Sequence, residues 1–275
     1  MRWLRPLLVA VFLICAILLF LFWSNCVIQT QTVEVTLAHL PQNFDGLRIV
    51  ELADLHGRQF GSDNEYLLQA VKNAQPDLIC IDGDFFDEDT DLAMLEPLVS
   101  GLVDIAPTFY VTGNHEWQVE NLHGILRHLE QLGAIVLENE YHTLERDGQK
   151  LVIAGVHDPC GPYDQLQPSE LVAQIRAAEG EEVCIIMLAH RNDTLPMWAE
   201  LQVDLVLTGH CHGGVIRLPL LGGVFGTKRE LFPEYDAGLY ERGQTQLYVS
   251  RGLGYTNTRL RLFNRPHLPV LVLRS

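Results

Sequence analysis

Five apolar stretches of this chain each end in residues that can bind a metal ion. The stretches cover residues 47–52, 78–81, 109–111, 184–188 and 205–207. The residues that follow them are carboxylates, histidines and one asparagine: Asp54, His56, Asp84, Asn114, His190, His210 and His212. In an open α/β sheet the carboxyl ends of the strands face one crevice. We therefore expect these seven side chains to converge, although they are distant in sequence.

The types of these residues suit a pair of divalent metal ions. Two ions about 3.5–4 Å apart need one carboxylate that bridges them, with neutral imidazoles and oxygen ligands around them. Residues two apart on an extended strand end point the same way, so Asp54 and His56 can aim at one centre. Mixed oxygen and nitrogen ligands suit Mn, Fe, Zn, Co or Ni. His115 follows Asn114 and is not needed as a ligand, so it is free for acid–base catalysis.

Each motif alone also has an ordinary structural explanation. Asp-x-His often occurs by chance, and Gly-Asn-His-Glu can be a turn that is capped by Asn114. Their joint occurrence in order, each at the end of a predicted strand, favours a metal-dependent hydrolase. Cys211 lies between His210 and His212, and we expect it to point away from the metals and to pack. A disulfide between Cys160 and Cys211 stays an alternative.

The ordered set resembles the calcineurin-like metallophosphoesterase superfamily. Further segments resemble its membrane-anchored YkuE/YaeI-like branch: residues 153–159, 188–191, 231–233, 248–252 and 263–266. The resemblance covers nearly everything after about Leu40. It implies an α/β fold in which two sheets pack face to face, with helices outside them. The branch usually follows its last metal histidine with Gly-Gly-Gln, whereas Val215 replaces the Gln here, which puts one polar contact to the substrate in doubt.

The resemblance also implies a role for each residue. Asp84 would bridge two ions. The remaining ligands would be Asp54, His56 and His212 at one ion, and Asn114, His190 and His210 at the other. A hydroxide that bridges the ions would attack a phosphomonoester or phosphodiester, and His115 would protonate the leaving oxygen. Asp87 and Glu116 would orient ligands through hydrogen bonds.

The distribution of charge limits the class of substrate. The net charge is −16. Residues 30–214 hold 8 basic and 31 acidic side chains, whereas residues 215–275 hold 9 basic and 4 acidic ones. An acidic domain repels the nucleic-acid backbone, so no nucleic-acid polymer is expected as a partner. Basic residues that could contact a small anionic substrate, or could simply offset the acidic body, are Arg217, Lys228, Arg229 and Arg251.

An unbroken apolar stretch near the N-terminus predicts a membrane anchor. Residues 7–23 would span roughly 25 Å as a helix. A cleaved signal peptide is the main alternative, but no Ala-x-Ala precedes a plausible cleavage site, and the residues before Cys26 make a poor lipobox. We therefore divide the chain into an anchor with a short linker, residues 1–31, and a catalytic domain, residues 32–275. Arg2 and Arg5 precede the apolar stretch, and the first basic residue after it is Arg48. The positive-inside rule then places the catalytic domain on the extracytoplasmic side of a single-pass protein.

Two other functions stay open. One is a hydrolase of a nucleotide-linked lipid precursor, of the UDP-diacylglucosamine type, at the cytoplasmic face of the membrane. The other is a non-catalytic metal-binding scaffold, which would be expected to have lost the acid or several ligands. For a lipid-linked substrate, we expect an apolar loop after the last histidines to admit the lipid-like group through Leu220, Leu221, Val224 and Phe225. The alternative is that this loop simply forms part of the core.

Four local patterns predict elements around these motifs. Ser62-x-x-Glu65 predicts a capping box that opens a helix. A second helix is expected over residues 122–132, ending at Gly133. Asp147-Gly148 predicts a hairpin turn between two strands. The alternating Val33, Val35 and Leu37 predict a strand that packs on the domain just after the anchor.

Overall fold

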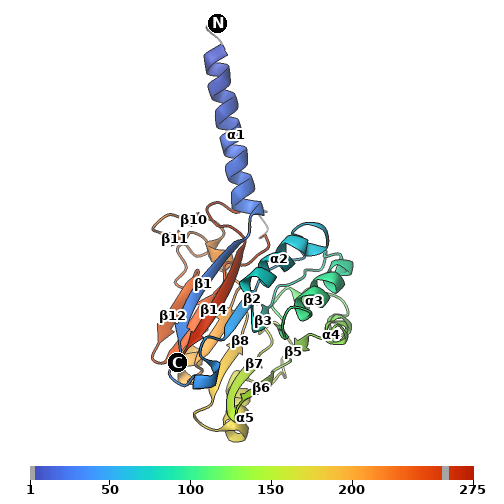
Figure 1. Ribbon diagram of the computed structural model, residues 1–275, viewed down its shortest axis with the longest axis vertical. Helices are drawn as coiled ribbons and strands as arrows, with labels where there is room; N and C mark the ends of the chain where they lie inside the picture. Colours follow the sequence, from blue (N-terminus) through green and yellow to red (C-terminus); the bar gives the residue numbers. More distant parts are fainter. Residues whose placement is uncertain (1–3, 256–259) are drawn as a thin grey trace.

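Two six-stranded sheets pack face to face in the computed structural model, which describes residues 4–255 and 260–275 (Figure 1). The first sheet has the order β1 (Gln29–Thr36), β14 (His267–Arg274), β2 (Arg48–Leu52), β3 (Leu78–Asp82), β4 (Thr108–Val111) and β5 (Ile135–Val136). The second has the order β12 (Gly238–Arg242), β13 (Thr245–Val249), β9 (Leu205–Thr208), β8 (Cys184–Leu188), β7 (Gln149–Gly155) and β6 (Glu140–Arg146). A short ribbon joins β10 (Arg217–Leu218) to β11 (Gly222–Gly223).

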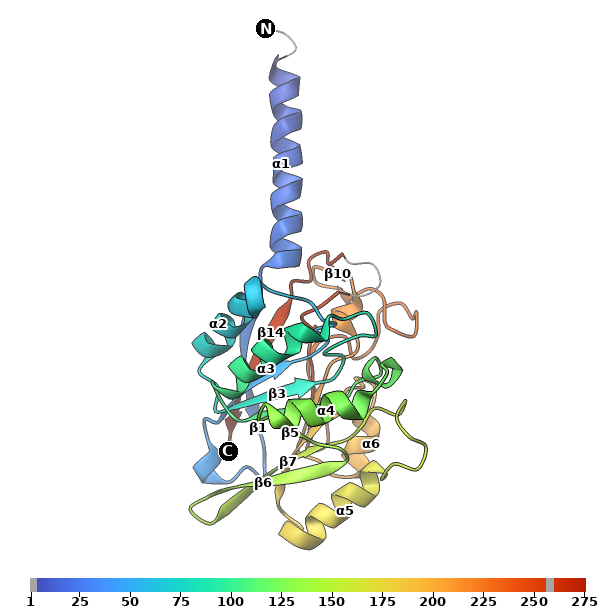
Figure 2. The same ribbon diagram turned by 90° about the vertical axis from the view of Figure 1, so that its right-hand side faces the viewer.

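Helices cover the outer face of each sheet. Those over the first sheet are α2 (Glu65–Ala74), α3 (Leu95–Val103) and α4 (Leu122–Gln131), and those over the second are α5 (Pro168–Glu179) and α6 (Leu195–Glu200) (Figure 2). Neighbouring residues of one strand enter different cores: Ile49 packs between the sheets, and Val50 packs under the helices. Burial on both faces explains why these strands read as continuous apolar runs. The predicted two-sheet sandwich with outer helices is confirmed.

Within each sheet, the strands that precede the predicted ligands are parallel to one another. β2, β3 and β4 are parallel in the first sheet, and β8 and β9 are parallel in the second. All five predicted apolar strands are present. Their carboxyl ends therefore lie at one edge of each sheet, which is the arrangement that the sequence predicted.

The N-terminal helix α1 (Leu4–Cys26) projects from the sandwich (Figures 1 and 2). Its segment Arg5–Cys26 has 22 residues and contains an 18-residue window with a mean hydropathy of 2.9, so its length and composition would allow it to cross a membrane. β1 follows α1 directly and pairs in parallel with β14. Val35 and Leu37 are buried, which confirms the strand predicted here.

Two of the other local predictions are confirmed and one is wrong. α4 ends at Gln131, close to Gly133, and the Asp147-Gly148 turn joins β6 to β7. The predicted capping box does not form. Residues 62–64 make a 3-10 turn, and the Asn64 side chain accepts a hydrogen bond from the Phe60 backbone instead of capping α2. The left-handed backbone at Asn64 redirects the chain, so α2 starts only at Glu65.

Candidate metal centre

The predicted ligands come from the ends of both sheets. Asp54, His56, Asp84 and Asn114 follow β2, β3 and β4, and the three remaining histidines follow β8 and β9. The carboxyl ends of the two sets of strands meet at one end of the sandwich. Two groups of these side chains are close enough to bind an ion: Asp54, His56, Asp84 and His212 in one, and Asp84, His190 and His210 in the other.

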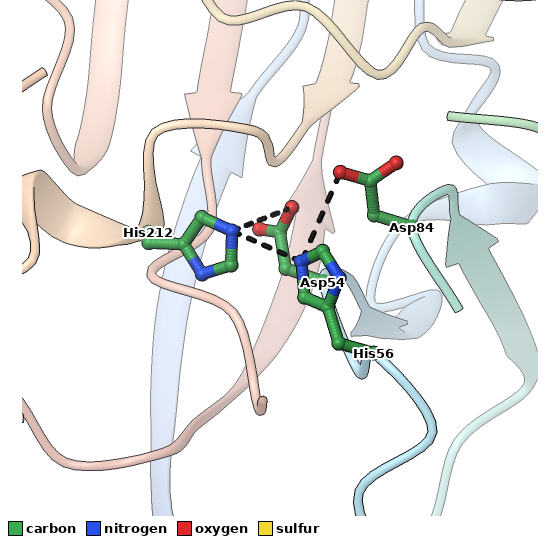
Figure 3. A group of neighbouring side chains, drawn as sticks. All are labelled: Asp54, His56, Asp84 and His212. Carbon is green, nitrogen blue, oxygen red and sulfur yellow. Dashed lines mark hydrogen bonds and ion pairs between the residues drawn. The ribbon is translucent and has the colours of Figure 1, made fainter. Parts of the chain in front are cut away.

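The first group surrounds a point between the two sheets (Figure 3). His56 Nε2 and His212 Nε2 lie 3.1 Å apart. Asp84 Oδ2 lies 3.8 Å from His56 Nε2, and Asp54 Oδ1 lies 3.8 Å from His212 Nε2. The candidate ligand atoms of all four residues lie within 4.8 Å of one another. Two imidazoles and two carboxylates at these distances can share one cation.

The second group shares Asp84 with the first. His190 Nε2 lies 3.1 Å from Asp84 Oδ2, and His210 Nδ1 lies 3.2 Å from His190 Nε2. Asn114 is close, because the backbone N–H of the next residue, His115, donates to Asp84 Oδ1 at 2.9 Å. The buried Oδ1 of Asn114 has no hydrogen-bond partner among the described residues. An amide oxygen without a donor is suited to be a metal ligand.

The backbone at these residues is strained. Five of the seven predicted ligands have a positive φ between 48° and 63°: Asp54, His56, Asp84, His210 and His212. Left-handed backbone at a residue with a side chain costs about 1–3 kcal/mol and persists only where the surrounding structure imposes it. Such strain concentrates at functional sites. In this chain the left-handed backbone directs these side chains toward the cluster directly after their strands end.

Hydrogen bonds orient the histidines through their other ring nitrogens. His56 Nδ1 lies 2.7 Å from Asp87 Oδ1, and His190 Nδ1 lies 2.9 Å from the Asp82 carbonyl oxygen. Arg191 Nη1 lies 2.9 Å from His210 Nε2. These contacts leave Nε2 of His56, Nε2 of His190 and Nδ1 of His210 to face the cluster. Partners of this kind fix the ring orientation of metal-binding histidines.

The Glu116 carboxylate joins two of the ligand-bearing loops. It accepts hydrogen bonds from the backbone N–H groups of Asp84, Phe85 and Gly113 at 2.6–3.0 Å, and from the Tyr110 hydroxyl at 3.0 Å. Burial and the nearby Asp84 charge raise the pKa of Glu116 to about 7, even though the backbone donors oppose this shift. Glu116 therefore holds the loops after β3 and β4 in register beneath the cluster.

His115 stands at the rim of the cluster. Its side chain is 39% exposed, and its Nδ1 lies 2.9 Å from Asp87 Oδ1. This hydrogen bond raises the pKa of His115 to about 9, against the effect of partial burial. Burial would raise the pKa of Asp87, but its hydrogen bonds with His115 and His56 hold it at about 2. A protonated imidazole that solvent can reach is suited to donate a proton.

Three of the four basic residues predicted to contact substrate have other partners. Arg217 Nη1 lies 2.9 Å from Asp236 Oδ2, and Lys228 pairs with Asp193. Arg251 is buried, and its Nη2 donates to the Gln29 side chain at 2.9 Å. Arg229 forms no ion pair within residues 4–255 and 260–275. Their role as substrate contacts stays a prediction.

Arg191 and Asp158 are site residues that the sequence reasoning missed. The Arg191 guanidinium makes two hydrogen bonds with Asp158, at 2.6 and 2.9 Å, while it also contacts His210. The signal was present, because Arg191 directly follows His190 and Asp158 follows the apolar run of β7. A bidentate pair of this kind fixes the guanidinium plane next to the second group.

The cysteines take no part in the cluster. Cys211 is buried in the core between the second sheet and its helices, as predicted. Burial raises the pKa of its thiol to about 12, which disfavours the thiolate that a metal would need. Cys160 and Cys211 are both free thiols, so the disulfide considered from the sequence is wrong. Cys160 is exposed and lies beside Arg191, whereas Cys211 faces the hydrophobic core.

Comparisons with known proteins agree with this geometry. Residues 47–214 match the calcineurin-like phosphoesterase family. The chain is 29% identical to the uncharacterized metallophosphoesterase YkuE of Bacillus subtilis, over 90% of this chain and 86% of that protein. It is 30% identical to the phosphodiesterase YaeI of Escherichia coli, over 86% of each. It is also 28% identical to a transmembrane protein with metallophosphoesterase domain of Danio rerio, over 88% of this chain and 56% of that protein.

A solved structure shows the same fold. The NAD nucleotidase NadN of Haemophilus influenzae superposes with a TM-score of 0.50 at 16% identity, over 76% of this chain and 45% of that one. The family match covers the stretch from the start of the strand that precedes Asp54 to the turn just after His212. On the strength of that match and of the relatives' identity, the chain belongs to the calcineurin-like phosphoesterase family of metal-dependent hydrolases.

Proposed function

We propose that this protein hydrolyses a phosphomonoester or phosphodiester at the membrane or cell envelope, with two divalent ions held by the seven predicted ligands. The observation that carries the proposal is the position of Asp84, which belongs to both groups of ligand atoms. One carboxylate shared by two sets of imidazoles is the arrangement that a two-metal site requires.

The residues present fit two ions. Asp54 Oδ2 and Asn114 Oδ1 are buried without a hydrogen-bond partner among the described residues, so each has an oxygen to offer a cation. Burying an unpaired carboxylate oxygen is costly unless a cation or a proton compensates it. The oxygen and nitrogen ligands suit Mn, Fe, Zn, Co or Ni. None of the ligands is missing, which argues against the non-catalytic scaffold.

The mechanism assigns distinct tasks to the residues of the chain. The ions, when bound, would supply Lewis-acid activation of the attacking water and would neutralise charge on the phosphoryl group. His115 donates a proton from its ring to the departing oxygen of the substrate, and Asp87 holds that ring through Nδ1. Glu116 keeps the loops of Asp84 and Asn114 together. Arg191 fixes the ring of His210.

The class of substrate is part of the proposal. The relative YaeI is named a phosphodiesterase, which favours a diester. The N-terminal apolar helix, and relatives that are named transmembrane proteins, indicate a membrane protein. We therefore propose residues 1–31 as anchor and linker, residues 32–275 as the catalytic domain, and a membrane or envelope phosphoester, in particular a lipid-linked one, as the substrate.

Metal content and turnover of Asp84→Asn test the proposal. The parent chain, purified in detergent, should contain close to two divalent ions and should hydrolyse nitrophenyl phosphodiesters or monoesters with one of the five metals. Asp84→Asn should lose metal from both sites, because it removes the shared carboxylate. Asp193→Asn makes the same chemical change at an exposed ion pair and should keep both ions. Elemental analysis that finds one ion or none in active parent protein would contradict the two-metal proposal.

A further inference from the structure

Exposed apolar side chains are concentrated at one end of the domain. Thirteen large hydrophobic residues outside α1 are exposed among the described residues, and eight of them belong to two neighbouring segments. We call these eight the apolar collar: Leu218, Leu220, Leu221, Phe225, Leu231, Phe232, Leu260 and Phe263. Their exposed fractions range from 38% to 106%. An apolar surface of this density marks an interaction site or a membrane contact.

The collar adjoins the base of α1. Ile216 pairs with Leu262 in a parallel bridge, which joins the two collar segments. The Phe263 ring lies 4.9 Å from the Phe20 ring of α1. Figures 1 and 2 both draw the β10–β11 segment at the end of the domain from which α1 emerges. The collar and the apolar helix therefore form one continuous apolar surface.

The last turn of α1 is fixed to the domain. Ser24 and Asn25 are buried, and both donate side-chain hydrogen bonds to the Arg261 carbonyl oxygen, at 2.8 and 3.1 Å. Arg265 donates to the carbonyl oxygens of Val27 and Ile28, which follow the helix. These contacts limit rotation of the domain about the end of the helix. If α1 spans a bilayer, the collar stays at the height at which α1 leaves the hydrocarbon.

The charge beside the collar suits an anionic bilayer surface. Four arginines around the base of α1 form no ion pair with a carboxylate among the described residues: Arg58 and Arg265, which are partly exposed, and Arg251 and Arg261, which are buried and do not face the surface. Their guanidinium groups donate to backbone carbonyl oxygens and to Gln29. The Arg265 guanidinium also lies 4.9 Å from the centre of the Trp23 ring. Arginine and tryptophan at the end of an apolar helix are typical of the headgroup layer.

We propose that the apolar collar inserts into the interfacial layer of an anionic lipid bilayer, beside α1. Loops that carry leucine and phenylalanine next to partly exposed arginines, here Arg58 and Arg265, bind such a layer through buried apolar area and attraction to anionic headgroups. The collar is also linked to the metal centre, because the side chain of Asn264 donates to the His212 carbonyl oxygen at 2.7 Å. Insertion would hold the ligand cluster next to the membrane surface. This inference depends on α1 spanning a membrane and not on the catalytic activity.

Tryptophan reporters test the insertion. The full chain is placed in nanodiscs of phosphatidylglycerol and phosphatidylcholine, with or without bromine on the lipid tails. Leu220→Trp should show more quenching by the brominated lipid than the parent protein does. Tyr163→Trp is the matched control, because Tyr163 and Leu220 are equally exposed, at 103% and 106%. Tyr163 lies between β7 and α5, in a segment that Figure 2 draws away from α1, and its replacement should add no quenching.

A second reporter excludes a local effect at residue 220. Phe232→Trp, on the other side of the collar, should also be quenched. The additional changes Leu220→Asp and Leu221→Asp should weaken that quenching, since charged side chains oppose insertion. Equal signals from the Leu220→Trp and Tyr163→Trp proteins, or no quenching of either collar reporter, would overturn the proposal. A collar that is covered by a second protein would also give no quenching by lipid.

Discussion

At the scale of single residues, a substitution of His115 can test the proposed proton transfer without a change in the proposed metal ligands. His115→Ala removes the proposed proton donor but none of the seven proposed ligands, so fold and metal content should stay unchanged. Turnover should fall by about 10²–10⁴-fold for substrates with a poor leaving group. The loss should be smaller for nitrophenyl esters, because nitrophenolate leaves with little protonation. His123→Ala, at an exposed histidine on α4, is the control, and equal losses for good and poor leaving groups would contradict the acid role.

A buried histidine outside the cluster should make the stability depend on pH. Burial, and then the nearby His123, lower the pKa of His157 to about 4, and its Nδ1 lies 3.0 Å from the Thr112 hydroxyl. Glu138 lies 3.5 Å from the other ring nitrogen and would favour the charged form, but burial outweighs this attraction. The folded protein therefore binds the proton less tightly than the unfolded chain does. The contribution of neutral His157 to the free energy of unfolding is fully present above the unfolded pKa of about 6.5, and it is lost as the pH falls toward 4.

The variant His157→Gln isolates this contribution, because glutamine does not titrate. The free energy of unfolding of the parent should fall relative to that of His157→Gln by up to about 3 kcal/mol between pH 6.5 and pH 4. Urea unfolding at several pH values measures the difference. Parallel curves for the two proteins would show that His157 keeps its ordinary pKa.

At the scale of elements, the position of the candidate ligands depends on the tight turns that follow the strands. Gly83 follows β3 with a φ of +72°, and an added Cβ would stand 2.5 Å from the Gly113 backbone nitrogen. Gly148 in the β6–β7 turn has a φ of +75°, but an added Cβ would meet nothing within 4 Å. Alanine at either position has the same backbone penalty, about 1–2 kcal/mol. Only Gly83→Ala also forces two ligand-bearing loops apart.

Gly83→Ala should therefore lower the melting temperature more than Gly148→Ala does, and it should reduce the metal content as well. Gly148→Ala should keep the metal content of the parent. Calorimetry and elemental analysis of the two variants make the comparison. Equal destabilisation with full metal content in both would show that the loops after β3 and β4 can separate without loss of the site.

The positions of the proposed strand-end ligands were predictable because one rule places all of them. A buried parallel strand reads as an apolar run, and the residue after it faces the common crevice, so Asp54 or His190 could be placed from the sequence alone. No such rule supported the predicted capping box, which was wrong. Ser62-x-x-Glu65 has the right spacing, but a left-handed turn at Asn64 satisfies the backbone differently. The Arg191–Asp158 pair depends on tertiary contacts between segments, which spacing does not encode.

At the scale of the whole molecule, the cluster depends on both sheets. Residues after β2, β3 and β4 supply part of it, and those after β8 and β9 supply the rest, so the ligands converge only when the sandwich has closed. The far end of the chain contributes as well. Residues 260–266 contact the last turn of α1 and the loop after β9. The N-terminal apolar helix, the collar and the candidate metal centre are thus joined through one short C-terminal segment.

The side of the membrane on which this assembly lies decides between two proposed substrates. Arg2 and Arg5 precede α1, and no basic residue follows it before Arg48, so we propose that the N-terminus is cytoplasmic and the metal centre extracytoplasmic. Protease added to intact cells, or to spheroplasts where an outer membrane blocks access, should then digest the catalytic domain. A cytoplasmic marker protein should survive the same treatment. A protected domain would contradict this orientation and would favour the hydrolase of a nucleotide-linked lipid precursor at the cytoplasmic face.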